Sequence, residues 1–513
     1  MTGELTFASG EPIDPQRKEA SAVATRLSTT RVLTGWGQLM RHKLTTGNGD
    51  QRSAKIGRRL ASVLFLLFVP LLVNGQINRA SPGLGSVPSG PATQEIIHLT
   101  LRDAISMAAR YNLSGIESGE NARAARGQRL QALSHLLPQV SAGAAENVEQ
   151  LSTSALGIKL PSIPSVTGPF SFSTAQASVN QTLFSFESIQ RFRAARTAEQ
   201  AARLSYNDAL DVITLVVGNA YLQVIETTSR IEAAEAQVRN AQAVYDQASE
   251  EFHAGTSPKI DVTRSSVQLH TEQYRLSVAR NDFAVAKLDL ARGIGLPLGQ
   301  AFEIADRIPY ADFEPPTVEQ ALKTAYASRS DFRAALSLVK SAQKELSAIR
   351  GERYPVVAAT GAYGVQGPAF GHSHGIFDFQ AVVSVPLFTG RRIEGNVTSA
   401  EAALTQRKAE AENLRGQIDY DVRKAYLNLQ AAKEQVAVAS QNVDLANENL
   451  ARSKERFAAG VTDSVEAVQA QQSLSSANDQ YIASLYSHNL AKLELARALG
   501  VARANYSQYL TAR

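Results

Sequence analysis

The sequence predicts a mainly α-helical protein with a small β part, built from one unit that occurs twice. Three observations support this fold class. Similar segments recur at nearly constant spacing, two proline-free runs are each long enough for a helix of about 100 Å, and short runs with period-two alternation precede each of them. The chain has 513 residues, of which 44% are hydrophobic and 19% charged, so it has enough apolar material to fold.

Residues 1–75 are interpreted as a leader with a signal peptide, cleaved near residue 75/76. Two arginines precede the apolar run 60–73, which is too short to span a bilayer, and small residues follow it. An N-terminal membrane anchor is the alternative. The leader is long, so Met1 and Met40 are both candidate starts. The segment 76–98, rich in Pro, Gly and Ser, is expected to be a flexible mature N-terminus.

The formal net charge of +4 arises in this leader. Residues 1–75 contain ten of the 52 Lys and Arg but only five of the 48 Asp and Glu, so the rest of the chain carries a formal charge of −1. We therefore expect no nucleic-acid partner. The absence of cysteine excludes disulfides, thiolate metal ligands and a cysteine nucleophile.

The duplication is visible in several matched segments. LTLRDAISMAARYN, from Leu99, aligns with PTVEQALKTAYASR, from Pro316, at an offset of 217. FHAGTS, from Phe252, aligns with FAAGVT, from Phe457, at an offset of 205. One net insertion between the strands of the first copy explains both offsets. The predicted parts are a first repeat (99–295), a linker (296–316), a second repeat (317–500) and a C-terminal tail (501–513).

Each copy has the same internal order. A short amphipathic helix comes first, and a second helix ends at LLPQV or RYPVV, because proline closes a helix and favours extended geometry before it. Two strands with one apolar and one mostly polar face follow. A long helical hairpin completes the copy. The predicted strands lie near 139–148, 173–184, 356–365 and 377–387, and the hairpins at 187–292 and 391–500.

The long helices are expected to pack along other helices. In the second copy, apolar and small residues step alternately by three and four, which is a heptad seam. Gly255 and Gly460 follow the last periodic residues and are natural helix terminators. The seam residues are Val422, Ala425, Leu429, Ala432, Val436, Ala439, Val443, Ala446 and Leu450.

Strands with an apolar face, combined with a signal peptide, predict an oligomeric outer-membrane barrel. No stretch after the leader is expected to form a membrane helix, and four strands cannot close a barrel alone. Several subunits would pool their strands above a tube of coiled helices. A periplasmic coiled-coil scaffold with a small soluble sheet is the main alternative. An enzyme on a helical scaffold is the second, but no phosphate-binding glycine loop, HExxH or nucleophile elbow is found, and no cofactor is expected.

The segments quoted above, together with VPLFTGRRI and FAAGVTDSVEAVQAQQSL, resemble the TolC-like outer-membrane efflux protein family over roughly 99–500. The resemblance implies a homotrimer with a 12-stranded barrel in outer-membrane lipid and a periplasmic α-barrel. It also implies a periplasmic adaptor and an inner-membrane RND or ABC transporter as partners. The expected function is a passive gated duct for drugs, toxic compounds, metals or, in type I secretion, protein.

The resemblance places a gate and the adaptor contacts at the two hairpin turns. Gly255, Thr256, Gly460 and Val461 would meet the adaptor, although these turns are also simple helix breaks. Two family acidic positions that ring the entrance correspond here to Glu466 and Gln469, so one ring is missing.

A family salt bridge joins an acid in the first turn to an arginine in the second. The acid corresponds to Asp261, but Thr462 stands at the arginine position, so this lock cannot form. Asp463 or Lys259 is a candidate substitute.

His372 and His374 lie in a loop expected to face outside. Alternate histidines can bind a metal, but without further ligands nearby a solvated loop is the preferred interpretation.

Overall fold

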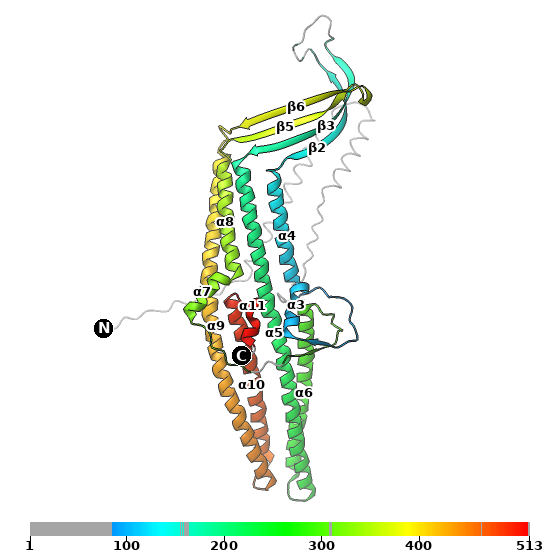
Figure 1. Ribbon diagram of the computed structural model, residues 1–513. Helices are drawn as coiled ribbons and strands as arrows, with labels where there is room; N and C mark the ends of the chain where they lie inside the picture. Colours follow the sequence, from blue (N-terminus) through cyan, green and yellow to red (C-terminus); the bar gives the residue numbers. More distant parts are fainter. Residues whose placement is uncertain are drawn as a thin grey trace, which may run out of the picture. The chain divides into compact units, whose positions relative to one another are not determined.

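The computed structural model describes residues 85–153, 155, 157, 164–306, 310–462 and 464–510. The predicted leader, both candidate starts and Asp463 lie outside the described residues. Each repeat contributes two shorter helices, two strands and a hairpin of two long helices (Figure 1).

A threonine caps the first helix of each repeat. The hydroxyl of Thr100 accepts a hydrogen bond from the N–H of Asp103, and Thr317 does the same for Gln320. These caps satisfy amide groups that have no partner in the first helical turn, which is why the helices begin there. A second helix follows and ends shortly before a proline. The four helices are α3 (Leu101–Tyr111), α4 (Leu113–Ser134), α7 (Val318–Ser328) and α8 (Ser330–Gly351).

The four long strands form one antiparallel sheet in the order β2-β3-β5-β6 (Figure 1). Ala142, Ala177, Tyr363 and Phe377 make up one row of directly opposed residues across the sheet. Because opposed residues project from the same face and successive residues from opposite faces, this row puts apolar side chains of all four strands on one face, although Phe172 and Ile376 project from the other. The strands are β2 (Gln139–Leu151), β3 (Thr167–Phe184), β5 (Val356–Gly367) and β6 (His374–Ser384).

The strand ends differ from the predicted ones. β6 begins and ends earlier than the predicted strand 377–387, since its last pair joins Ser384 to Val356 and Pro386 has no N–H to extend the ladder. β2 and β3 continue farther than expected, up to the pair Leu151 and Thr167.

Two apolar clusters hold the long helices together. The predicted seam of α9 is buried except at Val443 and Ala446, which are half-buried, and it packs with Ala491 and Leu495 of α10. The other cluster joins α5 and α6 to the short helix α3. The long helices are α5 (Phe186–His253), α6 (Lys259–Ile294), α9 (Arg392–Ala458) and α10 (Ser464–Ala498).

Helix α5 corrects the expectation that no later segment suits a membrane helix. Among the helices in the described ranges, it has a window that is long and apolar enough to cross a membrane, by length and composition only. However, 56% of that window is buried inside the protein. Its apolar residues, including Ile213, Val217 and Val224, build the first core cluster instead.

The segments on either side of the first repeat pair with each other, which their local composition did not predict. β1 (Ile97–Leu99) runs parallel to β4 (Phe302–Ile304) in the predicted linker. Ahead of β1, the N–H of Thr93 donates to the side-chain oxygen of Gln300 at 2.7 Å. The described part of 76–98 is therefore ordered by contacts about two hundred residues away in sequence. The predicted tail contains a further helix, α11 (Ala502–Leu510).

Candidate functional site at the hairpin tips

Both long hairpins reverse through the same backbone motif. The N–H groups of Gly255 and Thr256 bond back to carbonyl groups of the last turn of α5, at 3.0 and 2.9 Å. Gly460 and Val461 repeat both bonds after α9, at 2.9 and 3.0 Å. The two glycines have φ angles of 76° and 67°. Such a left-handed glycine with paired return bonds ends a helix and satisfies its last carbonyl groups.

Both tips are exposed within this chain. Gly255, Thr256, Gly460 and Val461 all lie at the surface, and a Cβ atom added to either glycine would meet no other atom within 4 Å. The tips can therefore accommodate another protein, and their contact with an adaptor stays a prediction.

Asp261 joins the two tips. It is 3% exposed, near the start of α6. Its Oδ1 atom accepts a hydrogen bond of 2.6 Å from the hydroxyl of Ser464, the first residue of α10. Its Oδ2 atom accepts one of 3.1 Å from Ser257, and Arg264 lies 3.5 Å from Oδ1. Ser464 of the second hairpin thus bonds to Asp261, whose expected arginine partner is replaced by Thr462 in this sequence.

Glu466 faces its own hairpin. Arg456 on α9 lies 3.6 Å from its carboxylate, and the hydroxyl of the buried Ser453 donates to the same oxygen at 3.4 Å. Gln469 is exposed on α10 and has no carboxylate to offer. The structure therefore joins Asp261 to Ser464, whereas Glu466 pairs within the second hairpin.

Further polar contacts join the hairpins, and none of them is predicted from the sequence. Each is a polar side chain that reaches the other repeat. The signal was present in the sequence, as polar residues interrupting the apolar seams. The contacts are Gln472 to Gln268 (3.2 Å), Arg275 to Ser475 (2.8 Å), Arg230 to Asp479 (3.4 Å) and Lys454 to Asn240 (3.0 Å).

Glu272 is the most enclosed acid among these contacts. It is 2% exposed, and its Oε1 atom accepts hydrogen bonds from Gln268 at 2.8 Å and Arg275 at 3.0 Å. Burial raises its pKa, and the neighbouring Arg275 only partly offsets that effect. The interface between the hairpins therefore carries several polar contacts, and it also holds a small apolar cluster that joins Phe457 of α9 to α5 near the tips.

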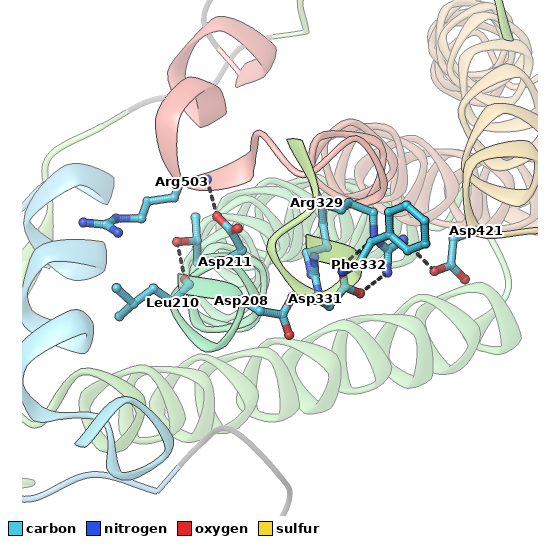
Figure 2. Close-up of polar contacts among 10 residues, drawn as sticks. Asp208, Leu210, Asp211, Arg329, Asp331, Phe332, Asp421 and Arg503 are labelled. Carbon is cyan, nitrogen blue, oxygen red and sulfur yellow. Dashed lines mark hydrogen bonds and ion pairs between the residues drawn. The ribbon is translucent and has the colours of Figure 1, made fainter. Parts of the chain in front are cut away.

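A second polar cluster joins the two repeats where α5, α8, α9 and α10 meet (Figure 2). Arg329 is 5% exposed and bonds to Asp331 at 2.7 Å and to Asp421 at 2.9 Å. Arg497 bonds to Asp208 at 2.6 Å. Burial by itself raises the pKa of Asp331, but Arg329 outweighs it and holds that pKa below its usual range. At Asp208 burial dominates and raises the pKa. The pair of Arg497 and Asp208, whose side chains are 15% and 24% exposed, links α5 to the second repeat.

His372 and His374 lie in the turn between β5 and β6, and the residues around them supply no third ligand. His372 belongs to a short 3₁₀ turn and His374 begins β6. Within the described ranges, no group of three or more His, Cys, Asp or Glu side chains is arranged to hold a metal ion.

Comparison with known proteins identifies the family. The family model described as outer membrane efflux protein matches residues 120–296 and 321–501, which is well over half of the chain. A protein of Pseudomonas putida, named as the pyoverdine export outer membrane protein OpmQ, is 24% identical over 293 residues. That match spans 55% of this chain and 61% of the relative, so it covers less than two thirds of the relative's length.

Solved structures share the fold at low sequence identity. The outer membrane protein VceC of Vibrio cholerae superposes with a TM-score of 0.68 and 19% identity, over 78% of this chain and 96% of VceC. The CmeC outer membrane channel of Campylobacter jejuni gives 0.69 and 15%, over 86% of this chain and 98% of CmeC. The chain belongs to the outer membrane efflux protein family, a family of the outer membrane whose long helices lie in the periplasm, as the resemblance predicted.

Proposed function

We propose that three copies of this chain form a passive, gated export duct through the outer membrane. The observation that carries the proposal is the open sheet. Its two outer strands, β2 and β6, each have one unpaired edge within the described chain. Unpaired edges recruit further strands, and a closed ring of strands is the form that satisfies every backbone group in lipid. Three copies would contribute twelve strands.

The exposed apolar face of the sheet supports the same proposal. Phe377 is 82% exposed, Phe379 73% and Tyr363 72%. A soluble sheet would cover such a face with helices, whereas a membrane barrel turns it toward lipid. The opposite face, which carries Gln176, Ser178 and Gln380 together with Phe172 and Ile376, would line the water-filled duct.

The tips are the proposed gate. The polar contacts between hairpins, led by Asp261 and Ser464 at 2.6 Å, hold the two tips of one subunit together. Polar contacts exchange readily with water, so separation of the tips would expose little apolar surface beyond the small cluster that joins Phe457 of α9 to Val244 and Ala248 of α5. A periplasmic adaptor contacting Gly255 and Gly460 would shift this equilibrium, and an inner-membrane RND or ABC transporter would supply energy and substrate.

Small molecules are the proposed cargo. The relative named for pyoverdine export supports this choice, although it shares only 24% identity over part of its length. A duct with a generic polar lining discriminates little, so the transporter would select the substrate. The duct itself needs no catalytic group.

Fractionation and conductance test the proposal together. We expect the chain in outer-membrane fractions as a detergent-stable, heat-modifiable trimer that conducts ions in planar bilayers. A monomer recovered from the soluble periplasm would instead support the coiled-coil scaffold. A trimer in the outer membrane that never conducts would contradict the duct.

A further inference from the structure

The connection between β6 and α9, residues 385–391, exposes the two least buried large apolar side chains of the described chain. Leu387 is 94% exposed and Phe388 is 90% exposed. We call residues 385–391 the rim loop. In the first repeat, Ser185 alone separates β3 from α5, so the rim loop is specific to the second repeat.

The rim loop lies beside a second connection at the same end of the sheet. Ser384 pairs with Val356, so the residues after β6 are next to those before β5. Arg392, the first residue of α9 after the rim loop, bonds to Glu352 at 2.7 Å and joins the two connections. Tyr354 in the second connection is 52% exposed. An aromatic ring with a polar tip at this level is typical of a membrane–water interface.

The rim loop continues the apolar face of the sheet. Phe379 and Val383 project from that face, and Leu387 continues their two-residue spacing in the sequence, beyond the last paired residue of β6, Ser384. Beyond this point the side chains become basic. Arg391 has an 89% exposed side chain that lies 3.9 Å from the carboxylate of Glu394, itself exposed. Arg353 is exposed and forms no ion pair with any residue that the structure describes. An apolar loop followed directly by exposed arginines matches the change from hydrocarbon to phosphate in a bilayer leaflet.

The backbone holds the rim loop in this exposed form. Gly390 and Arg391 both have positive φ angles, 57° and 64°. Arg391 is the one residue other than glycine with a positive φ in the described ranges. A left-handed arginine is unfavourable unless its surroundings impose it. The turn at Gly390 and Arg391 changes the direction of the chain between the rim loop and the start of α9.

We propose that the rim loop anchors the protein in the periplasmic leaflet of the outer membrane. Leu387 and Phe388 enter the hydrocarbon edge, and Arg353 and Arg391 bind the phosphate groups of anionic phospholipids. The inference rests on the proposed barrel, because the barrel puts this end of the sheet at the leaflet surface. Lipid is favoured over a neighbouring copy because the strand ladder stops before Pro386 and because Arg353, in the adjacent connection, is exposed without a carboxylate partner among the residues that the structure describes.

Single tryptophan reporters test the anchor. The sequence contains one tryptophan, Trp36, so a Trp36→Phe background gives a clean signal. Phe388→Trp reports the rim loop, Tyr363→Trp reports the sheet face, and Phe252→Trp at a hairpin tip is the water-side control. The full-length protein is reconstituted in vesicles with and without brominated phospholipid, which quenches tryptophan on contact. We expect strong quenching at residues 388 and 363 and none at 252.

The three reporters separate failure of the anchor from failure of the barrel. Quenching at 363 without quenching at 388 would overturn the anchor and leave the barrel intact. Absence of quenching at both would overturn the barrel and the anchor with it. If the emission of the tryptophan at 388 is blue-shifted but brominated lipid does not quench it, the loop lies in a contact between copies. That result would also overturn the anchor.

The arginine contacts need a second measurement. Phe388→Trp is expected to be quenched more by brominated phosphatidylglycerol than by brominated phosphatidylcholine. The double change Arg353→Gln and Arg391→Gln should remove that difference, whereas the matched change Arg407→Gln on the exposed face of α9 should keep it. Equal quenching by both lipids before any arginine is changed would overturn the phosphate contact.

Discussion

Replacing Asp261 with alanine should loosen the contact between the two tips. Of its three polar contacts, only the 2.6 Å bond from Ser464 reaches the other hairpin. A hydrogen bond to a charged group contributes about 1.5–3 kcal/mol. We therefore expect Asp261→Ala to weaken the coupling between hairpins by about 2 kcal/mol per subunit, which is roughly a 30-fold change in the equilibrium between joined and separated tips.

Hydrogen exchange and conductance measure this change independently. The amides at the start of α10 should exchange faster in Asp261→Ala, and single channels should stay open longer. The matched control is Asp444→Ala, an exposed acid on α9, which should change neither. Ser464→Ala should reproduce the effect, and the double variant should add little to either single change, because both remove the same bond. Additive effects, or unchanged exchange in Asp261→Ala, would refute this account of the tip contact.

Three further predictions concern the tips and the helix core. Gly460→Val should destabilise the turn by at least about 1 kcal/mol, since a β-branched residue is strained at a φ of 67°. The variant should cross-link less to the adaptor, and normal cross-linking would contradict the prediction. Glu466→Gln should lower cation selectivity, and Arg456→Gln, which frees the same carboxylate from a cation 3.6 Å away, should raise it; unchanged reversal potentials in both would exclude that site. Burial, followed by the charge of Lys492, lowers the pKa of His488 to about 4 from 6.5, so its folded form binds fewer protons than the unfolded chain between these values. Stability should therefore be complete above pH 6.5 and fall by about 2 kcal/mol at pH 5. His488→Phe, which keeps an aromatic ring against Tyr310, should remove that loss in urea unfolding.

Local patterns were sufficient for the regular elements. The seam of α9, the glycine turns and the strand pairs follow from residue periodicity and from the special geometry of glycine and proline, which depend on neighbours in sequence. The strand ends were less well predicted, because a strand ends where its partner ends. Ser384 is the last paired residue of β6 because it lies opposite Val356, the first residue of β5.

The candidate site was predicted in its location but not in its contacts. The sequence indicated two tips, an acid at Asp261 and a missing arginine at Thr462. Replacement of that arginine by Ser464 could not be read from the sequence, since the residues are about two hundred positions apart and no pattern reports which polar side chains face each other. The pairing of Glu466 with Arg456, ten positions away across the turn, was also missed, because no sequence pattern reports which polar side chains face each other.

The sequence by itself determined a duplicated, mainly helical chain with one apolar sheet face, since periodicity and repeat offsets are properties of the chain alone. The tertiary structure decided what those repeats do to each other. It paired β1 with β4, placed Arg329 between Asp331 and Asp421, and joined the tips through a buried carboxylate. It also left Leu387 and Phe388 exposed at the strand–helix joint. These features depend on distances between segments far apart in sequence, and only folding sets those distances.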